Sequence, residues 1–184
     1  MDVPFSLVSG HVGLNLAGTV GHWYLPSQFD RLTRPERVSD WIQEAGLLDA
    51  APEVDAEGRE TTLTLRAAIY RLTMAHINAQ PADPADLDTV NAAAARPPVT
   101  IRLSTSGRLT RIGDLGQALA SIGRETIELL GGPDAERMKV CGAQDCTRLY
   151  LDTSRRGDRR WCDMRECGNR AKATAYRRRK AASA

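Results

Sequence analysis

The stretch "CGAQDCTRLYLDTSRRGDRRWCDMRECGNR", residues 141–170, contains all four cysteines of the 184-residue chain. Cys141 and Cys146 form one pair and Cys162 and Cys167 a second, with four residues inside each pair and fifteen between the pairs. Two close pairs of thiols at this separation are typical of a tetrahedral four-thiolate site. Zinc is the usual metal because it accepts sulfur ligands and has no redox chemistry of its own. We therefore predict one structural zinc ion bound by all four cysteines.

The low apolar content of the C-terminal region supports this metal site. Residues 137–184 contain few large apolar side chains, too few for a core of their own. A structural zinc ion supplies roughly 10–16 kcal/mol of binding free energy that is coupled to folding. The alternatives are two disulfides, which a reducing compartment disfavours, and four unrelated buried cysteines. Four thiolates leave no open position for water, which argues against a catalytic zinc.

The net charge of +2 hides an asymmetry along the chain. Residues 137–184 carry fourteen Lys and Arg against five Asp and Glu, a net charge of +9, whereas the rest of the chain carries −7. Such a basic region predicts a polyanionic partner, and we expect double-stranded DNA. Eleven of the fourteen are arginines, which make bidentate contacts with phosphates and guanine. The alternative is a solvated basic tail that serves solubility.

The basic residues fall on two predicted elements. Gly157 and Asp158 are typical of a turn, so the arginines around them should lie in a loop between the cysteine pairs. A helix should begin near Met164, where basic residues recur at seven-residue steps. The predicted nucleic-acid contacts are Arg155, Arg156, Arg159, Arg160, Arg165, Arg170, Lys172, Arg177, Arg178, Arg179 and Lys180.

The sequence of the acidic N-terminal part, residues 1–132, indicates a mainly helical domain. Apolar residues at helical spacing predict helices over 33–46, 62–79, 86–95 and 114–130, of which the first and last have Thr33–Glu36 and Asp114–Gln117 capping pairs. Alternation over 99–104 and 109–112 predicts a β-hairpin. We therefore expect an α+β, mainly α fold with a helical domain over residues 1–132 and a zinc module over 137–184 that ends in a basic helix.

Several classes of protein are disfavoured. No apolar run approaches the ~20 residues of a membrane helix, and the N-terminus lacks the basic start of a secretory signal. We therefore expect a cytoplasmic protein without a membrane segment. The three histidines are scattered, and no nucleophile elbow, P-loop or dinucleotide fingerprint occurs, so we expect no enzymatic activity.

The segment from Cys141 to Lys180 closely resembles the CGNR-type zinc finger, whose signature is Cys167-Gly168-Asn169-Arg170. The segments "VSDWIQEAGLL", "LTLRAAIYRL" and "IELLGGPDAERMKVC" resemble the ABATE domain that precedes this finger in bacterial proteins. The resemblance implies a bacterial transcription regulator, with DNA binding by the finger and effector sensing by the N-terminal domain.

One segment departs from the family pattern. Relatives usually show an "LD-F-x-NT"-like stretch, whereas residues 14–19 here read "LNLAGT", with Asn15 in place of the acid and Gly18 in place of the asparagine. If this stretch lines a ligand pocket, Asn15 and Thr19 are the candidate ligand-binding residues, and the departure would change the ligand preference.

For Asn169 we favour capping of backbone groups near the metal over contact with a base.

The functional hypothesis is thus a DNA-binding regulator with a small-molecule effector and, as symmetric DNA sites often require, a homodimeric state. One alternative is an RNA-binding zinc protein. Another is a small-molecule sensor whose finger serves protein interaction. The sequence leaves open the target sequence, the effector, the oligomeric state, and whether transcription rises or falls.

Overall fold

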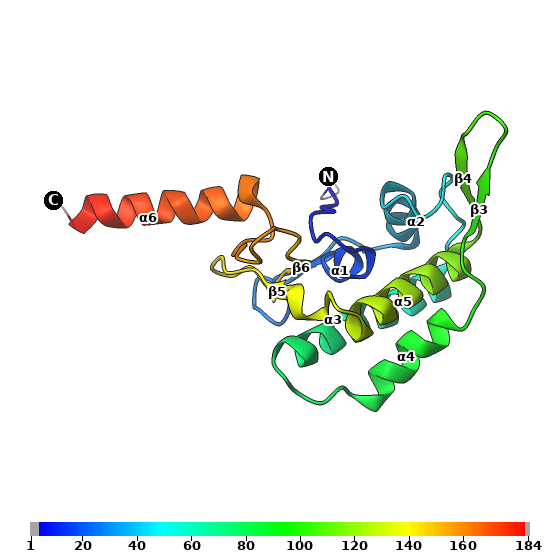
Figure 1. Ribbon diagram of the computed structural model, residues 1–184, viewed down its shortest axis with the longest axis horizontal. Helices are drawn as coiled ribbons and strands as arrows, with labels where there is room; N and C mark the ends of the chain where they lie inside the picture. Colours follow the sequence, from blue (N-terminus) through cyan, green and yellow to red (C-terminus); the bar gives the residue numbers. More distant parts are fainter. Residues whose placement is uncertain (1–3, 183–184) are drawn as a thin grey trace.

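A computed structural model describes residues 4–182 and consists of a helical body, a projecting hairpin and a C-terminal region that ends in a long helix (Figure 1). The body contains α1 (Val12–Ala17), α2 (Pro35–Glu44), α3 (Ala56–Ile77), α4 (Pro84–Ala94) and α5 (Leu115–Gly131). The C-terminal region contains 3-10 helix η1 (Ala135–Arg137), β5 (Met138–Val140), β6 (Leu149–Leu151), π-helix η2 (Met164–Gly168) and α6 (Asn169–Ala182). The mainly α, α+β prediction is confirmed.

The described residues form three separate two-stranded antiparallel sheets. β1 (Val20–Gly21) pairs with β2 (Phe29–Asp30), β3 (Thr100–Leu103) with β4 (Leu109–Ile112), and β5 with β6. In residues 4–182, no helix is both long and apolar enough to cross a lipid bilayer.

The core of the body forms where α3, α4 and α5 pack together and α1 and α2 cover them (Figure 1). Trp41, Leu65, Ile69 and Ile122 are fully buried there, as their helical spacing in the sequence predicts. Burial of each such side chain stabilises the fold by about 1.5–3 kcal/mol relative to exposure.

The helix starts were only partly predicted. At α5 the capping box is confirmed, since Asp114 Oδ1 accepts from the Gln117 amide and Gln117 Oε1 accepts from the Asp114 amide. At α2 the predicted box is wrong, because Arg34 is the N-cap and Pro35 begins the helix. Proline suits the first helical position, where its fixed φ fits and its missing N–H is not needed.

Helix α3 begins earlier than the apolar pattern indicates. It starts at Ala56 rather than near Thr62, so the polar residues directly before Thr62 are also helical. Asp55 caps this start by accepting a hydrogen bond from the Gly58 amide at 2.7 Å. The first turns of α3 are polar because they face solvent, and an apolar repeat cannot reveal such turns.

The β5–β6 hairpin joins the C-terminal region to the body. Leu149 and Leu151 on one face of β6 are buried in the core of the body, together with Met138 of β5. Tyr150 points the opposite way, as strand alternation requires, and is buried against the cysteines. The Leu151 amide also donates to the Ser9 carbonyl at 2.8 Å. The C-terminal region therefore shares the hydrophobic core of the body, which the apolar count of residues 137–184 did not indicate.

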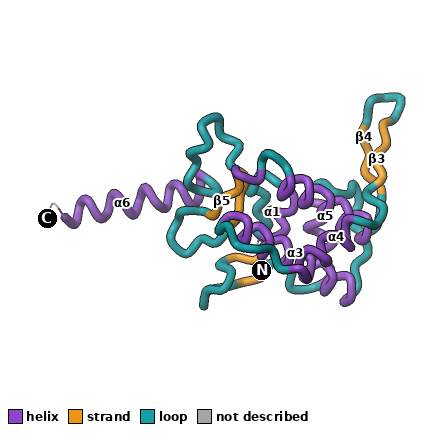
Figure 2. The backbone as a smooth tube through the Cα atoms, turned by 60° about the horizontal axis from the view of Figure 1, so that its bottom comes forward, coloured by secondary structure: helices purple, strands orange, loops and turns teal. Residues whose placement is uncertain are grey.

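Helix α6 has the opposite character. It extends away from the rest of the molecule (Figures 1 and 2) and packs chiefly against η2, from which it continues. The orientation of α6 therefore depends on the position of η2.

We predict that Leu149→Ala destabilises the body and the C-terminal region together. The lost packing and the cavity should lower the free energy of unfolding by about 2–5 kcal/mol. Urea unfolding followed by tryptophan fluorescence, which reports on the buried Trp41, measures this effect. Met164→Ala, at an exposed apolar residue, is the control. An unchanged midpoint for Leu149→Ala would contradict the shared core.

Candidate metal centre

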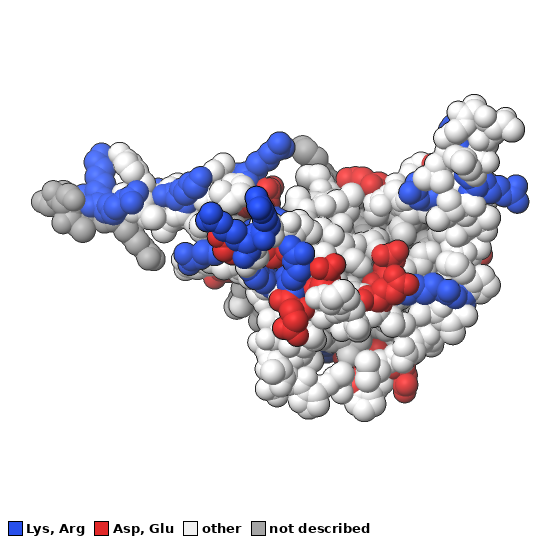
Figure 3. Space-filling model, viewed as in Figure 1, with Lys and Arg blue, Asp and Glu red and all other residues white. Residues whose placement is uncertain are grey.

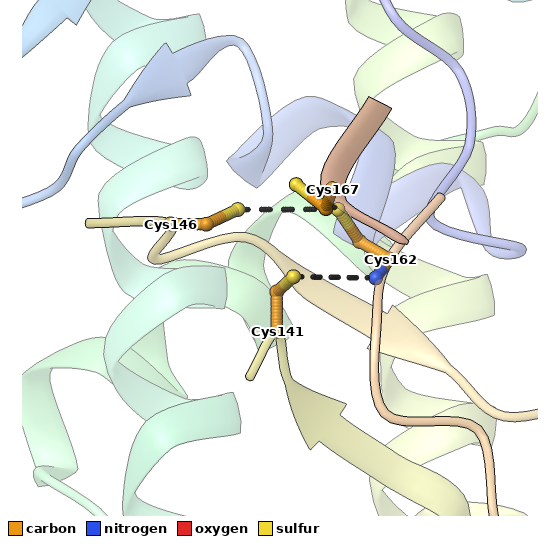
Figure 4. Close-up of side chains that lie close together, drawn as sticks. All are labelled: Cys141, Cys146, Cys162 and Cys167. Atoms are coloured by element: carbon orange, nitrogen blue, oxygen red, sulfur yellow. Dashed lines mark hydrogen bonds between the residues drawn. The ribbon is translucent and has the colours of Figure 1, made fainter. Parts of the chain in front are cut away.

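The four cysteines converge from the β5–β6 connection, the loop before η2 and η2 itself (Figure 4). Cys141 directly follows β5, Cys146 lies in the next loop, Cys162 precedes η2, and Cys167 lies within it. All four Sγ atoms lie within 4.8 Å of one another, with 3.9 Å between Cys146 and Cys162 and 3.6 Å between Cys162 and Cys167.

These distances fit a zinc ion. Four Zn–S bonds of about 2.3 Å in a tetrahedron place the sulfur atoms about 3.8 Å apart. A disulfide would need about 2.05 Å, and all four cysteines are free thiols. The four sulfurs would hold zinc as a closed structural site, because no coordination position is left for substrate or water. The predicted metal and ligand set are confirmed, and the disulfide alternative is wrong for this structure.

The loop between the first two cysteines has the backbone conformation that the site needs. Asp145 adopts φ +62, in the left-handed region that Asp tolerates better than most residues, and this turns Cys146 toward the centre. The Cys146 amide closes the turn on the Ala143 carbonyl at 3.1 Å. The Gly142 amide donates to the Arg160 carbonyl at 2.8 Å, which connects this loop to residues 152–161, the arginine-rich loop before Cys162 that we call the basic loop.

Hydrogen bonds at the sulfur atoms favour ionisation of one thiol over its neighbours. Cys146 and then Cys162 interact with the Cys141 sulfur and lower the pKa of Cys141, to which the Cys162 amide also donates at 3.3 Å. The interaction with Cys141 raises the pKa of Cys146 to about 11. Protons therefore remain on part of the metal-free site, and zinc binding must release them.

A buried carboxylate, Asp152, organises the basic loop that follows β6. Its side chain is fully buried and accepts from Lys139 Nζ at 2.7 Å, the Arg159 amide at 2.9 Å and the Ser154 amide at 3.0 Å. Burial alone would raise the pKa of Asp152, but the hydrogen bonds from Lys139, Ser154 and Arg159 outweigh burial and hold it well below its ordinary value. Sequence reasoning missed this residue, although an Asp followed by Thr-Ser after a strand is typical of such a turn.

Two of the predicted nucleic-acid residues are engaged with the metal centre. Arg170 Nη2 donates to Cys167 Sγ at 3.3 Å, and this hydrogen bond raises the pKa of Arg170. Arg159 donates to the carbonyls of Trp161 and Cys162 and lies over the Tyr150 ring. Tyr150 in turn donates to the Arg159 carbonyl at 2.5 Å. Both guanidinium groups thus have structural partners, and their contact with nucleic acid stays a prediction.

The other predicted basic residues with described side chains lie exposed on three consecutive segments. They cover the loop before Cys162 and the helices η2 and α6, and form patches of positive charge there (Figure 3). We call them the exposed basic set: Arg155, Arg156, Arg160, Arg165, Lys172, Arg177, Arg179 and Lys180. The side chain of Arg178 lies outside the described residues.

A cavity of about 200 Å³ separates the metal centre from the body, and arginines line it. Arg31 comes from the body, Arg148 and Arg170 from the C-terminal region, and three of the cysteines form the opposite wall. Arg31 Nη1 is buried without a hydrogen-bond partner among the described residues. Burial and then the nearby Arg148 lower the pKa of Arg31. Since four thiolates outweigh the charge of one zinc ion, these guanidinium groups are placed to balance the excess negative charge.

At residues 14–19, where the sequence departs from the family pattern, Gly18 has a structural reason. A Cβ atom at Gly18 would lie 2.5 Å from Arg148 Nη1, so the missing side chain makes room for this guanidinium group, which donates to the Ser6 carbonyl at 2.9 Å. Asn15 Oδ1 accepts from the Ser9 amide at 2.9 Å. Thr19 Oγ1 donates to the Leu16 carbonyl and accepts from Arg66. The two candidate ligand-binding residues therefore have internal partners, and their contact with a ligand stays a prediction.

Asn169 and Gly168 have local roles near the metal. Asn169 Nδ2 donates to the Arg165 carbonyl at 3.0 Å, across the junction of η2 and α6. A Cβ atom at Gly168 would lie 2.9 Å from the Met164 sulfur. This geometry agrees with the capping role that the sequence favours for Asn169.

We predict that Asp152→Ala destabilises the C-terminal region by about 3–5 kcal/mol, because the Ser154 and Arg159 amides would lose their buried acceptor and Lys139 would lose its ion-pair partner. Thermal unfolding at neutral pH measures the change. Asp158→Ala, at an exposed acid in the same loop, is the control and should behave as the unaltered protein. Equal stability of the two variants would argue against the role of Asp152.

We predict that Arg170→Met weakens zinc binding about 10–100-fold, as is usual when a hydrogen bond to a ligand atom is lost. Competition with a chromophoric chelator measures the affinity. The matched control is Arg177→Met, which removes an exposed charge from α6. The role of Arg170 is refuted if both variants retain zinc equally well.

Comparison with known families gives two matches. The ABATE family, with the description "Putative stress-induced transcription regulator", matches residues 10–133. The CGNR zinc finger matches residues 137–180 and so includes all four cysteines and most of α6. No curated protein matches the chain.

Proposed function

We propose that this chain, which belongs to the ABATE family and carries a CGNR zinc finger, regulates transcription by binding double-stranded DNA through α6 and the loop before Cys162. The observation that carries the proposal is the geometry of α6. It is a basic helix that begins at the metal centre and projects away from the body, so that DNA can approach it from several sides (Figure 1).

The dimensions of α6 suit the major groove. Its fourteen residues extend about 21 Å, and an α-helix with side chains is about 10–12 Å wide, close to the ~12 Å width of the groove. The short alanines between the basic residues allow close approach of the helix to the bases. Arg155, Arg156 and Arg160 would reach the phosphates on one side of the groove, where they would fix orientation without reading sequence.

The charge of α6 also needs a polyanion. Residues 169–182 contain six Lys and Arg and no Asp or Glu. Like charges three or four residues apart destabilise an isolated helix, although cations in the last turn interact favourably with the helix dipole. Phosphates would remove the repulsion, so we expect α6 to gain helical stability when DNA binds.

Zinc gives the interface its rigidity. Cys167 lies in η2, and α6 continues directly from η2, so the metal would fix the direction in which α6 leaves the protein. The protein would need a reducing compartment such as the cytoplasm to keep its thiols available for zinc. We assign it no catalytic role.

Effector sensing by the body is the second part of the proposal. The 200 Å³ cavity borders both the body and the metal centre, so a small molecule there would contact both regions. A ligand changes DNA binding only if it has different affinities for the free and DNA-bound states.

RNA binding is the second candidate function, and one observation favours it. Tyr176 is exposed among the basic residues of α6 and could stack on an unpaired base. Competition between duplex DNA, duplex RNA and single strands distinguishes the candidates. A preference for single-stranded RNA would replace DNA as the proposed partner.

We predict that DNA affinity falls steeply with salt. If about five phosphates are neutralised, the plot of log affinity against log salt concentration should have a slope of about −4 to −5. Lys172→Gln should weaken binding to all sequences alike and make the slope shallower by about one. Fluorescence anisotropy with a labelled duplex measures both quantities.

The matched control is Arg34→Gln, which removes one exposed charge from the start of α2, an element outside the proposed interface. It should leave the slope unchanged. Binding that does not depend on salt, or equal effects of the two substitutions, would contradict the proposed interface.

A further inference from the structure

The β3–β4 hairpin exposes apolar side chains that a monomer leaves uncovered. It projects from the body as an arm (Figure 2). The exposed fractions of Ile101, Leu103, Leu109 and Ile112 are 64%, 73%, 43% and 54%. Ile101 and Leu103 share one face, and Leu103 pairs with Leu109 across the strands, so three of these four side chains form one patch. A two-stranded hairpin is marginally stable alone, which indicates that this patch packs against something.

The arm is also basic. Residues 99–112 contain Arg102, Arg108 and Arg111 and no acidic residue, and blue side chains lie on both sides of the base of the arm in Figure 3. Its base is fixed, because the Asp49 amide donates to the Arg111 carbonyl at 3.1 Å and Asp49 Oδ2 accepts from the Arg111 amide at 3.2 Å. The arm thus presents a fixed surface that is apolar and positively charged.

A groove with the opposite charge lies beside the base of the arm. Two adjoining hollows of about 560 and 460 Å³ share Glu57, Thr61, Arg96, Gly116 and Leu119 and lie between α3, α4 and α5. Arg96 and Asp114 of this groove precede and follow the arm in sequence. Apolar side chains contribute to its floor, and its acidic residues are Glu53, Asp55, Glu57, Glu60 and Asp114.

We propose that two copies of this chain form a symmetric dimer in which the arm of each copy lies in the α3–α4–α5 groove of the other. The apolar patch of the arm would cover the floor of the groove. Arg108 beside the turn and Arg111 on the same face as the patch would face the acidic rim. This inference is independent of the proposed DNA binding.

The position of the groove explains why the partner is a second copy. A two-fold axis beside the base of the arm brings both arm–groove contacts close together, and such a contact closes at two chains instead of growing into a fibre. Within one chain the arm projects from the body and leaves its apolar patch exposed. Charge complementarity between the basic arm and the acidic groove sets the pairing.

Charge reversal on each side tests the proposal. The arm variant carries Arg108→Glu and Arg111→Glu, and the groove variant carries Glu57→Arg and Glu60→Arg at two exposed positions. Light scattering after size exclusion should give twice the 20.1 kDa chain mass for the unaltered protein and the monomer mass for each variant alone. An equimolar mixture of the variants should form dimers again, because the reversed arm then meets the reversed groove and the unaltered arm meets the unaltered groove.

Two controls separate association from folding. Asp134→Arg with Glu136→Arg makes the same change of charge at the opposite end of α5 and should remain dimeric. Leu103→Asp should give monomers, whereas Thr100→Asp, on the other face of β3, should not. Circular dichroism checks that each variant is folded. A monomeric unaltered protein, a dimer that survives both reversals, or a mixture that stays monomeric would overturn the proposal.

Discussion

The constraint on which the other features depend is the convergence of four cysteine sulfurs on one point between the β5–β6 hairpin and η2. A tetrathiolate site fixes three loops at once, and it does so where apolar side chains are scarce. The site also sets the direction of α6, because α6 continues from η2 and packs chiefly against it. The metal would therefore orient a helix as well as stabilise a region.

The β6 strand shows how the metal centre is attached to the body. Alternate residues of the strand serve two different clusters, with Leu149 and Leu151 in the body and Tyr150 against the cysteines. Tyr150 reaches the Arg159 carbonyl, and Asp152 holds the Arg159 amide, so the basic loop is connected to the same strand. A short series of packed side chains thus connects the body with the loop and the metal, and the proposed effector sensing would act through such contacts.

Local patterns in the sequence predicted the metal ligands, the β3–β4 hairpin and the capping box of α5. Each depends on residues that are close in sequence or on a chemistry that few other arrangements satisfy. The shared core around Leu149, the burial of Asp152 and the internal roles of Arg159 and Arg170 could not be predicted in this way. These depend on contacts between distant segments, and charge alone cannot distinguish an arginine that binds a thiolate from one that binds DNA. The start of α2 was wrong for a local reason, since a proline at the first helical position outweighed the Thr33–Glu36 pattern.

The central proposal is that a single zinc ion holds the exposed basic set in the arrangement that binds DNA. Its most direct test removes the metal from the full-length protein with a chelator and then restores it stepwise while duplex affinity is followed at constant salt. We predict that affinity is lost with the metal and returns in proportion to zinc, with saturation at one ion per chain. Full affinity in the metal-free protein, or saturation at a different stoichiometry, would contradict the account.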